Sequence, residues 1–377
     1  MTFTNLGVSQ PLIQTLINKG YLIPTPIQVQ SIPIVLQGKD IFGCAQTGTG
    51  KTAAFALPIL QLLQEKNDSS TKKTIKALIL APTRELAQQI YDSFRVYGSN
   101  YKLNTCVIFG GVGQAAQVSS LKNGTDIVVA TPGRLLDLMN QGFVKLNNVE
   151  HFVLDEADRM LDMGFINDIK KIIAKLPKQK QTLFFSATVS PEIKHLANNI
   201  LVSPSYVSVS PISSTAETVK QSLYYVNKED KRSLLKHVLN NDTIEHALVF
   251  TRTKRGADKV ARDLNNDGIK AEAIHGNKSQ GARERALKGF KGRKIRVLVA
   301  TDIASRGIDV DKLTHVINYE IPEQAETYVH RIGRTGRAGS SGIALSFCAK
   351  EEVSYIRDIN KLINKNIEIV KSHPFVK

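Results

Sequence analysis

The sequence predicts an α/β protein with two doubly wound parallel-sheet domains in tandem, joined by a flexible linker. A chain of 377 residues is too long for one hydrophobic core of ordinary size. Short apolar runs alternate along it with helical patterns, as in parallel α/β folds. A Ser- and Pro-rich stretch at 202–217 divides these runs into two sets. The predicted boundaries are a first domain at 1–205, a linker at 206–217 and a second domain at 218–377.

The apolar runs predict buried parallel strands, because strands covered on both faces read as nearly continuous hydrophobic segments. The predicted strands are 77–81, 126–130, 151–155 and 182–186 in the first domain, and 246–250, 269–274, 295–300, 315–319 and 343–347 in the second. Polar clusters follow most of these runs. Ligands of open parallel sheets bind beyond the carboxyl ends of the strands, so the functional residues are expected in these clusters.

Composition limits the setting of the protein. Hydrophobic residues make up 42% and charged residues 22%, as in soluble globular proteins. No apolar run approaches the ~20 residues that span a bilayer, and the N-terminus does not have the pattern of a signal peptide. The three cysteines (Cys44, Cys106 and Cys348) are scattered and odd in number, which argues against a disulfide framework or a zinc site. These features predict a cytoplasmic protein without a membrane segment.

The formal net charge of +16 favours anionic partners, and nucleic acid is the first candidate. The alternative is a basic surface that serves solubility alone. Both halves of the chain are basic, so a polyanion could contact both domains.

The segment AQTGTGKT at 45–52 predicts a nucleoside triphosphate site. Glycines let a loop fold around a phosphate so that several backbone N–H groups point at it, and the following helix N-terminus favours negative charge. Lys51 is expected to reach the β- and γ-phosphates, and Thr52 to occupy a Mg²⁺ position. The predicted loop residues are Ala45, Gln46, Thr47, Gly48, Thr49, Gly50, Lys51 and Thr52.

The segment VLDEAD, which ends at Asp158, supplies carboxylates at the end of an apolar strand. Asp155 suits the coordination shell of Mg²⁺, and Glu156 suits polarising the attacking water. Together with the phosphate loop, this pair predicts a Mg²⁺-dependent triphosphatase in which Lys51, Asp155 and Glu156 are catalytic.

Seven segments in order carry a family resemblance: AQTGTGKT, PTRELA, TPGR, DEAD, SAT, ATDIASRGID and HRIGRTGR. The chain resembles the DEAD-box ATP-dependent RNA helicases of superfamily 2 over essentially its whole length. Within them it is similar to the bacterial RhlE-type branch, an assignment that rests on connecting stretches such as 275–291. The resemblance implies two RecA-like domains and RNA-stimulated ATP hydrolysis coupled to domain closure. It further implies local, non-processive unwinding of short RNA duplexes and RNA–protein remodelling.

By this resemblance the first thirty residues recognise adenine. In GYLIPTPIQ (20–28), Gln28 would read the adenine edge, since an amide offers both a donor and an acceptor. The upstream aromatic Phe3 would pack on the ring; its alternative role is a core anchor. Tyr21 stands where the family often has Phe, and belongs to the same expected ATP site.

The resemblance also explains the second domain. In HRIGRTGR, Arg334 and Arg337 would act as arginine fingers on the γ-phosphoryl group, although the same residues could form a basic turn facing nucleic acid. The other implied roles are catalysis for His330, ATP contacts for Gly307 and Asp309, and coupling for Asp158, Ser186, Thr188 and Arg331.

RNA is expected across the rim of the cleft opposite the nucleotide, held by residue types that suit phosphate and sugar contacts, so binding should not depend on base sequence. The implied residues are Thr83, Arg84, Gly110, Gly111, Thr131 and Arg134 in the first domain, and Arg252, Thr301 and Arg306 in the second.

The sequence is compatible with two other functions. One is an ATP-gated RNA clamp or scaffold component without physiological unwinding. The other is a DNA translocase, which would share the phosphate loop and the arginines. The expected partners are RNA and the ribosomal precursors or mRNA-decay machinery that contain it, and the expected state is a monomer.

Overall fold

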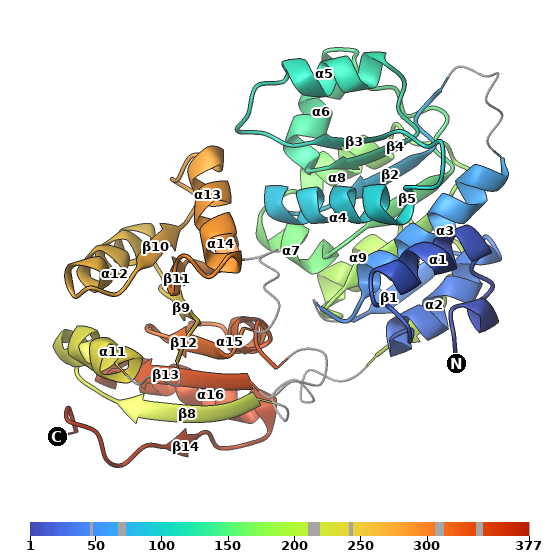
Figure 1. Ribbon diagram of the computed structural model, residues 1–377. Coiled ribbons are helices and arrows are strands. Elements are labelled where there is room, and N and C mark those ends of the chain that lie inside the picture. Colours follow the sequence, from blue (N-terminus) through green and yellow to red (C-terminus); the bar gives the residue numbers. More distant parts are fainter. Residues whose placement is uncertain are drawn as a thin grey trace. The chain divides into compact units, whose positions relative to one another are not determined.

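The computed structural model describes residues 1–45, 48–66, 73–209, 219–240, 244–305, 313–336 and 342–376. The chain divides into two compact units, Met1–Val209 and Ser210–Lys377. Within each unit, helices cover both faces of one sheet (Figure 1). None of the described helices is long and apolar enough to cross a membrane.

The first unit is built on seven parallel strands in the order β3-β4-β2-β5-β6-β1-β7. The strands are β1 (Ile41–Cys44), β2 (Ala77–Leu80), β3 (Thr105–Ile108), β4 (Ile127–Ala130), β5 (His151–Leu154), β6 (Gln181–Ser186) and β7 (Ser205–Ser208). The helices are α1 (Gln10–Asn18), α2 (Pro26–Leu36), α3 (Lys51–Glu65), α4 (Arg84–Tyr97), α5 (Ala115–Lys122), α6 (Pro132–Asn140), α7 (Ala157–Asp162), α8 (Ile166–Ile173) and α9 (Pro191–Asn198), with a 3₁₀ turn at Thr4–Leu6.

The second unit repeats the plan with seven parallel strands in the order β10-β11-β9-β12-β13-β8-β14. The strands are β8 (Val219–Tyr225), β9 (Ala247–Phe250), β10 (Ala271–Ile274), β11 (Val297–Ala300), β12 (His315–Asn318), β13 (Gly342–Cys348) and β14 (Glu368–Ile369). The helices are α11 (Lys231–Leu239), α12 (Lys254–Asn266), α13 (Gln280–Lys291), α14 (Asp302–Ser305), α15 (Ala325–Ile332) and α16 (Val353–Ile363), with 3₁₀ turns at Lys228–Asp230 and Lys350–Glu352.

Each sheet is buried on both faces because successive side chains of a strand point to opposite sides. In β2, Ala77 and Ile79 join the core formed with α3 and α4, whereas Leu78 and Leu80 join the core formed with α6, α8 and α9. In β9, the neighbouring residues Val249 and Leu248 likewise belong to two different cores, one on each face of the second sheet. The predicted fold class, two tandem parallel-sheet α/β domains, is therefore confirmed.

Most of the strands that the apolar runs did not reveal are partly exposed; β1, which is largely buried, is the exception. β3 and β8 alternate between buried and more exposed residues, so neither reads as a continuous apolar run. β7 lies in the Ser-rich stretch and pairs with β1 at the edge of the first sheet. The predicted linker therefore began too early, since 206–208 belong to this sheet. Residues 210–217 of that linker lie outside the described residues.

Helix α13 ends in a Schellman motif with an arginine where glycine is usual. The N–H of Lys294 donates to the carbonyl of Gly289 at 2.9 Å, and the N–H of Arg293 donates to that of Phe290 at 3.0 Å. Arg293 has φ = 56°, which lies in the left-handed region, and this conformation is energetically unfavourable for a residue with a Cβ.

Replacing Arg293 with glycine is therefore expected to raise the unfolding free energy of the second unit by about 1 kcal/mol. Urea denaturation of parent and variant measures the difference. A lower stability would mean that the Arg293–Glu245 ion pair, at 3.1 Å, outweighs the backbone cost.

Candidate nucleotide and nucleic-acid sites

The predicted phosphate loop joins β1 to α3. Lys51 is the first residue of α3 and only 5% exposed, and its Nζ donates a hydrogen bond to the carbonyl oxygen of Ala45 at 2.7 Å. A buried ammonium beside a helix N-terminus makes a site for an anion. Gly48, Thr49, Gly50 and Thr52 belong to the same described stretch, whereas Gln46 and Thr47 lie outside the described residues.

Gln28 on α2 is tied to this loop. Its Oε1 accepts from the N–H of Thr25 at 2.9 Å, and its Nε2 donates to the carbonyl oxygen of Gly50 at 3.1 Å. Gly50 has φ = 94°, and a Cβ there would lie 2.4 Å from Gln28 Nε2, so only glycine fits. The amide keeps one N–H and one lone pair for a further partner. Gln28 thus connects the predicted adenine-reading motif directly to the phosphate loop.

The two predicted aromatic residues of this motif differ in exposure. Phe3 is 4% exposed and packs in the core of the first unit, which matches the anchoring alternative raised for it. Tyr21 is 54% exposed, and its ring meets that of Tyr97 edge-on at 6.5 Å between centroids. Of the two, Tyr21 is the aromatic side chain with a face available to a base.

Asp155 follows β5 and is almost completely buried. Burial raises its pKa to about 6; the nearby Lys51 opposes this rise and Glu156 adds to it. Its Oδ1 has no hydrogen-bond partner among the described residues. A buried carboxylate oxygen without a partner is costly unless a cation or donor meets it.

This orphaned oxygen fits the predicted Mg²⁺ position. The described residues contain no group of three or more His, Cys, Asp or Glu that could hold a metal by itself. Mg²⁺ commonly uses only one or two carboxylates and completes its shell with substrate phosphates and water. Asp155 is a donor of this kind, and Thr52 lies at the start of α3 beside Lys51.

Glu156 has an unusual backbone and a buried ion pair. Its φ of 56° is left-handed, and it precedes the first residue of α7. Its Oε2 lies 2.7 Å from Nη1 of Arg159, and both side chains are nearly inaccessible. Non-glycine residues held in this conformation often occur at functional sites. Sequence reasoning missed Arg159, although the three-residue spacing along α7 could have indicated the pair.

The predicted coupling residues of the first unit come together at the ends of β5 and β6. Asp158 Oδ2 accepts hydrogen bonds from the N–H of Ala187 and of Thr188, both at 3.1 Å, and from Thr188 Oγ1 at 3.3 Å. Ser186 Oγ donates to the carbonyl oxygen of Thr188 at 2.8 Å. The DEAD and SAT segments therefore form one hydrogen-bonded unit.

The RNA candidates of the first unit follow three neighbouring strands, β3, β4 and β2. The Arg84 guanidinium lies against Gly110 and Gly111, and a Cβ on Gly111 (φ = 80°) would come within 1.9 Å of Arg84 Nη1. Arg134 donates to the carbonyl oxygen of Val112 at 3.3 Å from both Nη atoms. The two remaining candidates, Thr83 and Thr131, are the N-cap residues of α4 and α6. All six candidates therefore lie beyond the carboxyl ends of neighbouring strands, on the same side of the sheet.

Arg331 of the arginine-rich segment is held by several hydrogen bonds. Its Nε and Nη2 donate to the two carboxylate oxygens of Asp302 at 2.6 and 2.8 Å. Its Nη1 donates to Asn318 Oδ1 and to the carbonyl oxygen of Glu320. The bond to Asp302 joins two of the predicted motifs, and Asp302 itself was not predicted. Arg334 is also buried, and His330 is partly exposed.

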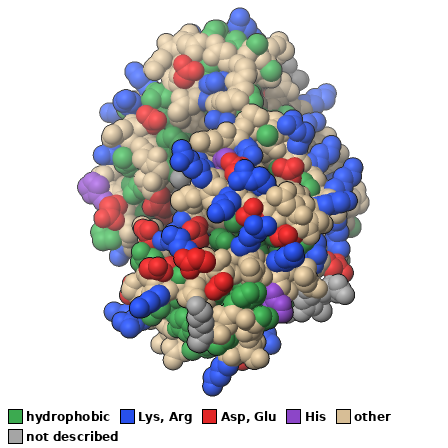
Figure 2. All heavy atoms as spheres, turned by 90° about the vertical axis from the view of Figure 1, so that its left-hand side faces the viewer, with side chains coloured by type: hydrophobic (Ala, Val, Ile, Leu, Met, Phe, Trp, Pro, Cys, Tyr) green, Lys and Arg blue, Asp and Glu red, His purple; other side chains and the backbone are tan. Residues whose placement is uncertain are grey.

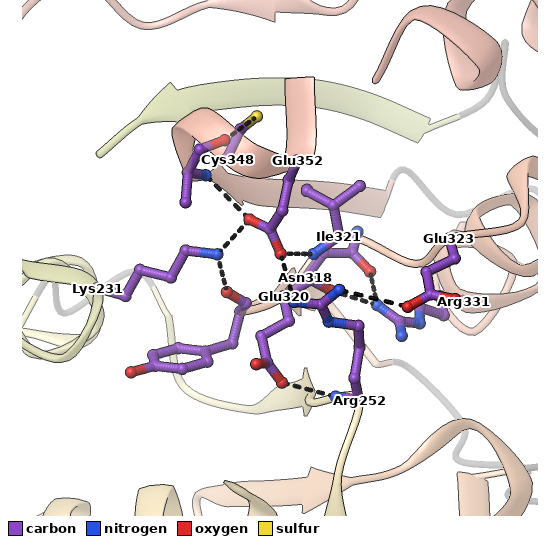
Figure 3. Close-up of polar contacts among 11 residues, drawn as sticks. Lys231, Arg252, Asn318, Glu320, Ile321, Glu323, Arg331, Cys348 and Glu352 are labelled. Atoms are coloured by element: carbon purple, nitrogen blue, oxygen red, sulfur yellow. Dashed lines mark hydrogen bonds and ion pairs between the residues drawn. The ribbon is translucent and has the colours of Figure 1, made fainter. Parts of the chain in front are cut away.

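Arg252, a predicted RNA contact, faces carboxylates (Figure 3). Its N–H donates to Glu320 at 2.7 Å, and its guanidinium lies 3.6 Å from Glu323 and 3.5 Å from Glu352. Its charge is thus partly balanced within the second unit. Thr301, the other described candidate, follows β11, the neighbour of β9 in the sheet. The predicted residues Arg306, Gly307, Asp309 and Arg337 lie outside the described residues.

Glu352 is the centre of this network and was not predicted. Besides Arg252 it binds buried Lys231, and it accepts from the N–H groups of Ile321 and Ala349 at 3.1 and 2.9 Å. Lys231 also donates to the carbonyl oxygen of Tyr319. Apart from Ala349, these partners are far apart from Glu352 in sequence, so no local pattern could have indicated its pairing with Lys231 and Arg252.

Comparisons with known proteins give a consistent result. Residues 25–196 match the family model described as DEAD/DEAH box helicase, and residues 230–339 match that of the helicase conserved C-terminal domain. The ATP-dependent RNA helicase CshA of Listeria monocytogenes is 42% identical over 97% of this chain and 69% of its own length. The CshA DEAD-box helicase of Bacillus subtilis is 42% identical over 98% of this chain and 74% of its own length.

Solved structures agree with these relatives. Yeast (S. cerevisiae) Dbp5 bound to RNA and ADP BeF3 has a TM-score of 0.85 and 30% identity, covering 98% of this chain and 95% of that one. Mss116p bound to ssRNA and AMP-PNP has a TM-score of 0.89 and 29% identity, covering 99% and 80%. The predicted RhlE-type branch is wrong, because the curated relatives named here are CshA proteins. That prediction rested on connecting stretches such as 275–291, a loop and helix with many exposed residues.

Proposed function

Because this chain belongs to the DEAD-box ATP-dependent RNA helicases, we propose that its ATP hydrolysis drives local, non-processive unwinding of short RNA duplexes and remodelling of RNA–protein complexes. One observation supports this proposal most strongly. The buried Lys51 ammonium begins α3, and the buried Asp155, whose Oδ1 has no hydrogen-bond partner among the described residues, follows β5 of the same sheet. A triphosphate site needs a cationic side chain that binds the phosphates and a carboxylate that binds the metal ion accompanying them.

Each residue of this site has a proposed role. Lys51 holds the β- and γ-phosphates, and Glu156 orients the attacking water while Arg159 holds its carboxylate. Asp155 and Thr52 would hold Mg²⁺, which supplies charge stabilisation for the departing phosphates. Asp158 transmits changes at this site to the SAT segment through its three hydrogen bonds.

We propose that Arg334 and Arg337 of the second unit complete the site when the two units close on ATP and RNA. Arg331 and Asp302 hold the arginine-rich segment in place for this step. ATP and RNA then bind cooperatively, with a coupling of order 1–3 kcal/mol. Loss of the γ-phosphate removes the anion that the arginines hold, so the units separate and RNA is released.

Fluorescence transfer between the units tests this mechanism. Dyes on Lys170→Cys in α8 and Lys361→Cys in α16, both exposed positions, report the distance in a background with half-buried Cys44 replaced by serine. A non-hydrolysable ATP analogue plus RNA should change the transfer efficiency, and Lys51→Ala should prevent that change. An unchanged efficiency in the parent protein would rule out closure.

RNA is proposed to bind through its backbone at the carboxyl edges of both sheets, without base specificity. Stronger stimulation of the ATPase by DNA than by RNA would favour a translocase instead. Stable retention on RNA without multiple-turnover unwinding would favour a clamp. We further propose that the protein is a cytoplasmic monomer with a CshA-type role. Its proposed targets include ribosomal precursors or the mRNA-decay machinery.

Gln28→Ala is expected to lower the preference for ATP over GTP by at least about tenfold, because the amide that would pair with adenine is lost. The structure adds a second effect, since the Gly50 carbonyl also loses its donor and the phosphate loop loosens. Values of kcat/KM for both nucleotides measure the change. Gln30→Ala, an exposed position on the same helix, is the control. Equal use of ATP and GTP by the parent protein would contradict the adenine-reading role.

A further inference from the structure

Basic side chains extend well beyond the predicted motifs. Figure 2 shows Lys and Arg over much of one face, interspersed with Asp and Glu. Helix α13 and the turn after it differ from such mixed surfaces. Five cations are exposed there, and we call them the α13 basic track: Arg285, Lys288, Lys291, Arg293 and Lys294.

The helix presents these cations because its other side is packed. Ala286 and Phe290 are buried against β9, β10 and β11, with Leu287 partly buried beside them. Arg285, Lys288 and Lys291 recur every three residues, so they lie along one side of the helix. From Arg285 to Lys291 the helix rises by roughly 9 Å, which brings three positive charges close together.

The track is poorly neutralised by the protein itself. Within the described part of the chain, Arg285, Lys288, Lys291 and Lys294 form no ion pair with a carboxylate. Arg293 pairs with Glu245, but both side chains are more than 60% exposed. The acidic residue of α13, Glu284, accepts a hydrogen bond from Gln280. Like charges at this spacing repel one another, and a bound polyanion would relieve the repulsion.

Helix α13 starts beside the edge where RNA is proposed to lie, and the track begins at Arg285, roughly 8 Å along this helix. The N–H of Thr301 donates to the carbonyl of Ile274, so the ends of β10 and β11 are adjacent. The loop from Ile274 to Ser279, the N-cap of α13, is held beside α12 by a 2.8 Å bond from Lys254 to Asn277. α13 then leads away from this edge along the sheet for roughly 18 Å.

Arg293 adds an independent observation. It occupies a left-handed position at which glycine would fit without backbone cost, and its side chain is 63% exposed and paired with the similarly exposed Glu245. Strain of this kind is a reason to look for a functional role of the side chain.

We propose that the α13 basic track binds the phosphate backbone of RNA flanking the segment held at the carboxyl edge of the second sheet. This rests on the proposed function, in which RNA lies at that edge. The track extends the contact beyond the family motifs, so long RNAs bind more tightly than short ones. Since the contacts are with phosphates, this advantage does not depend on base sequence and weakens with salt.

The test uses the full chain with a non-hydrolysable ATP analogue and two oligouridylates. One of about 10 nucleotides is long enough for the carboxyl edge alone, and one of about 40 nucleotides also reaches the α13 basic track. The triple variant Arg285→Gln/Lys288→Gln/Lys291→Gln should weaken binding of the long RNA about tenfold at low salt and change the short RNA less than twofold. Its slope of log affinity against log salt for the long RNA should fall by about 2, since each single-strand contact contributes ~0.7. Lys170→Gln/Lys171→Gln/Lys175→Gln, exposed lysines in and just after α8, removes the same charge and should leave both affinities unchanged.

A second variant separates binding from folding. Arg293→Gly should weaken long-RNA binding about twofold while raising the thermal midpoint, so a loss of affinity cannot be attributed to unfolding. Unchanged long-RNA affinity in the triple variant, or equal losses for both lengths, would overturn the proposal. Binding of polyglutamate to the parent but not to the triple variant, with RNA unaffected, would assign the track to an acidic protein and also overturn it. Failure of the parent to bind either RNA would instead refute the proposed function.

Discussion

Glu156→Gln is expected to lower kcat for ATP hydrolysis by about 10³-fold while ATP and RNA remain bound. The amide keeps the size of the side chain but no longer polarises the attacking water. Its environment adds a cost, because Arg159, 2.7 Å away and buried, loses its charged partner. Steady-state ATPase with saturating RNA measures kcat, and anisotropy with labelled RNA and an ATP analogue measures binding.

Lys51→Ala separates binding from chemistry at the same site. It should also abolish hydrolysis, but mainly by weakening nucleotide binding, since it removes the buried ammonium that is proposed to hold the phosphates. Lys76→Ala removes a lysine from the surface pair with Glu150 and should change neither property. Near-parental turnover by Glu156→Gln would show that another group orients the water.

Glu352→Ala is expected to lower the unfolding free energy of the second unit by about 3–5 kcal/mol, because Lys231 would remain buried without its counter-charge. The N–H groups of Ile321 and Ala349 would lose their acceptor as well. Native-state hydrogen exchange of β12 and β13 amides reports the stability of this unit within the full chain. The segment that holds Arg331 should loosen with it, so RNA-stimulated ATPase should fall too.

Two variants give this measurement its reference points. Glu245→Ala, which breaks the exposed pair with Arg293, should cost less than about 0.5 kcal/mol. Lys231→Met/Glu352→Leu removes both buried charges and should recover part of the loss, though the two backbone N–H groups stay without an acceptor. A loss below 1 kcal/mol in Glu352→Ala would mean that water enters and solvates Lys231.

Features encoded by contiguous residues were accessible without coordinates. The run ALIL predicts β2 because a strand covered on both faces needs apolar side chains throughout. β8 escaped the same reasoning because one of its faces is less buried and its residues alternate. Lys51 and Asp155 were predicted to meet because each follows a parallel strand, and such ends share one edge of the sheet. The order of the motifs similarly led to the helicase family, whereas the branch assignment failed on a partly exposed segment.

The sequence by itself determined the fold class, the family and the identity of the triphosphate motifs, since these depend on local patterns and their order along the chain. Only the tertiary structure decided which distant residues hold the motif residues: Gln28 on Gly50 and Asp302 on Arg331. It also placed Glu352 between Lys231 and Arg252. The physical reason is that a buried charge needs a partner nearby in space, and neighbouring strands of a parallel sheet bring together residues that are far apart in sequence.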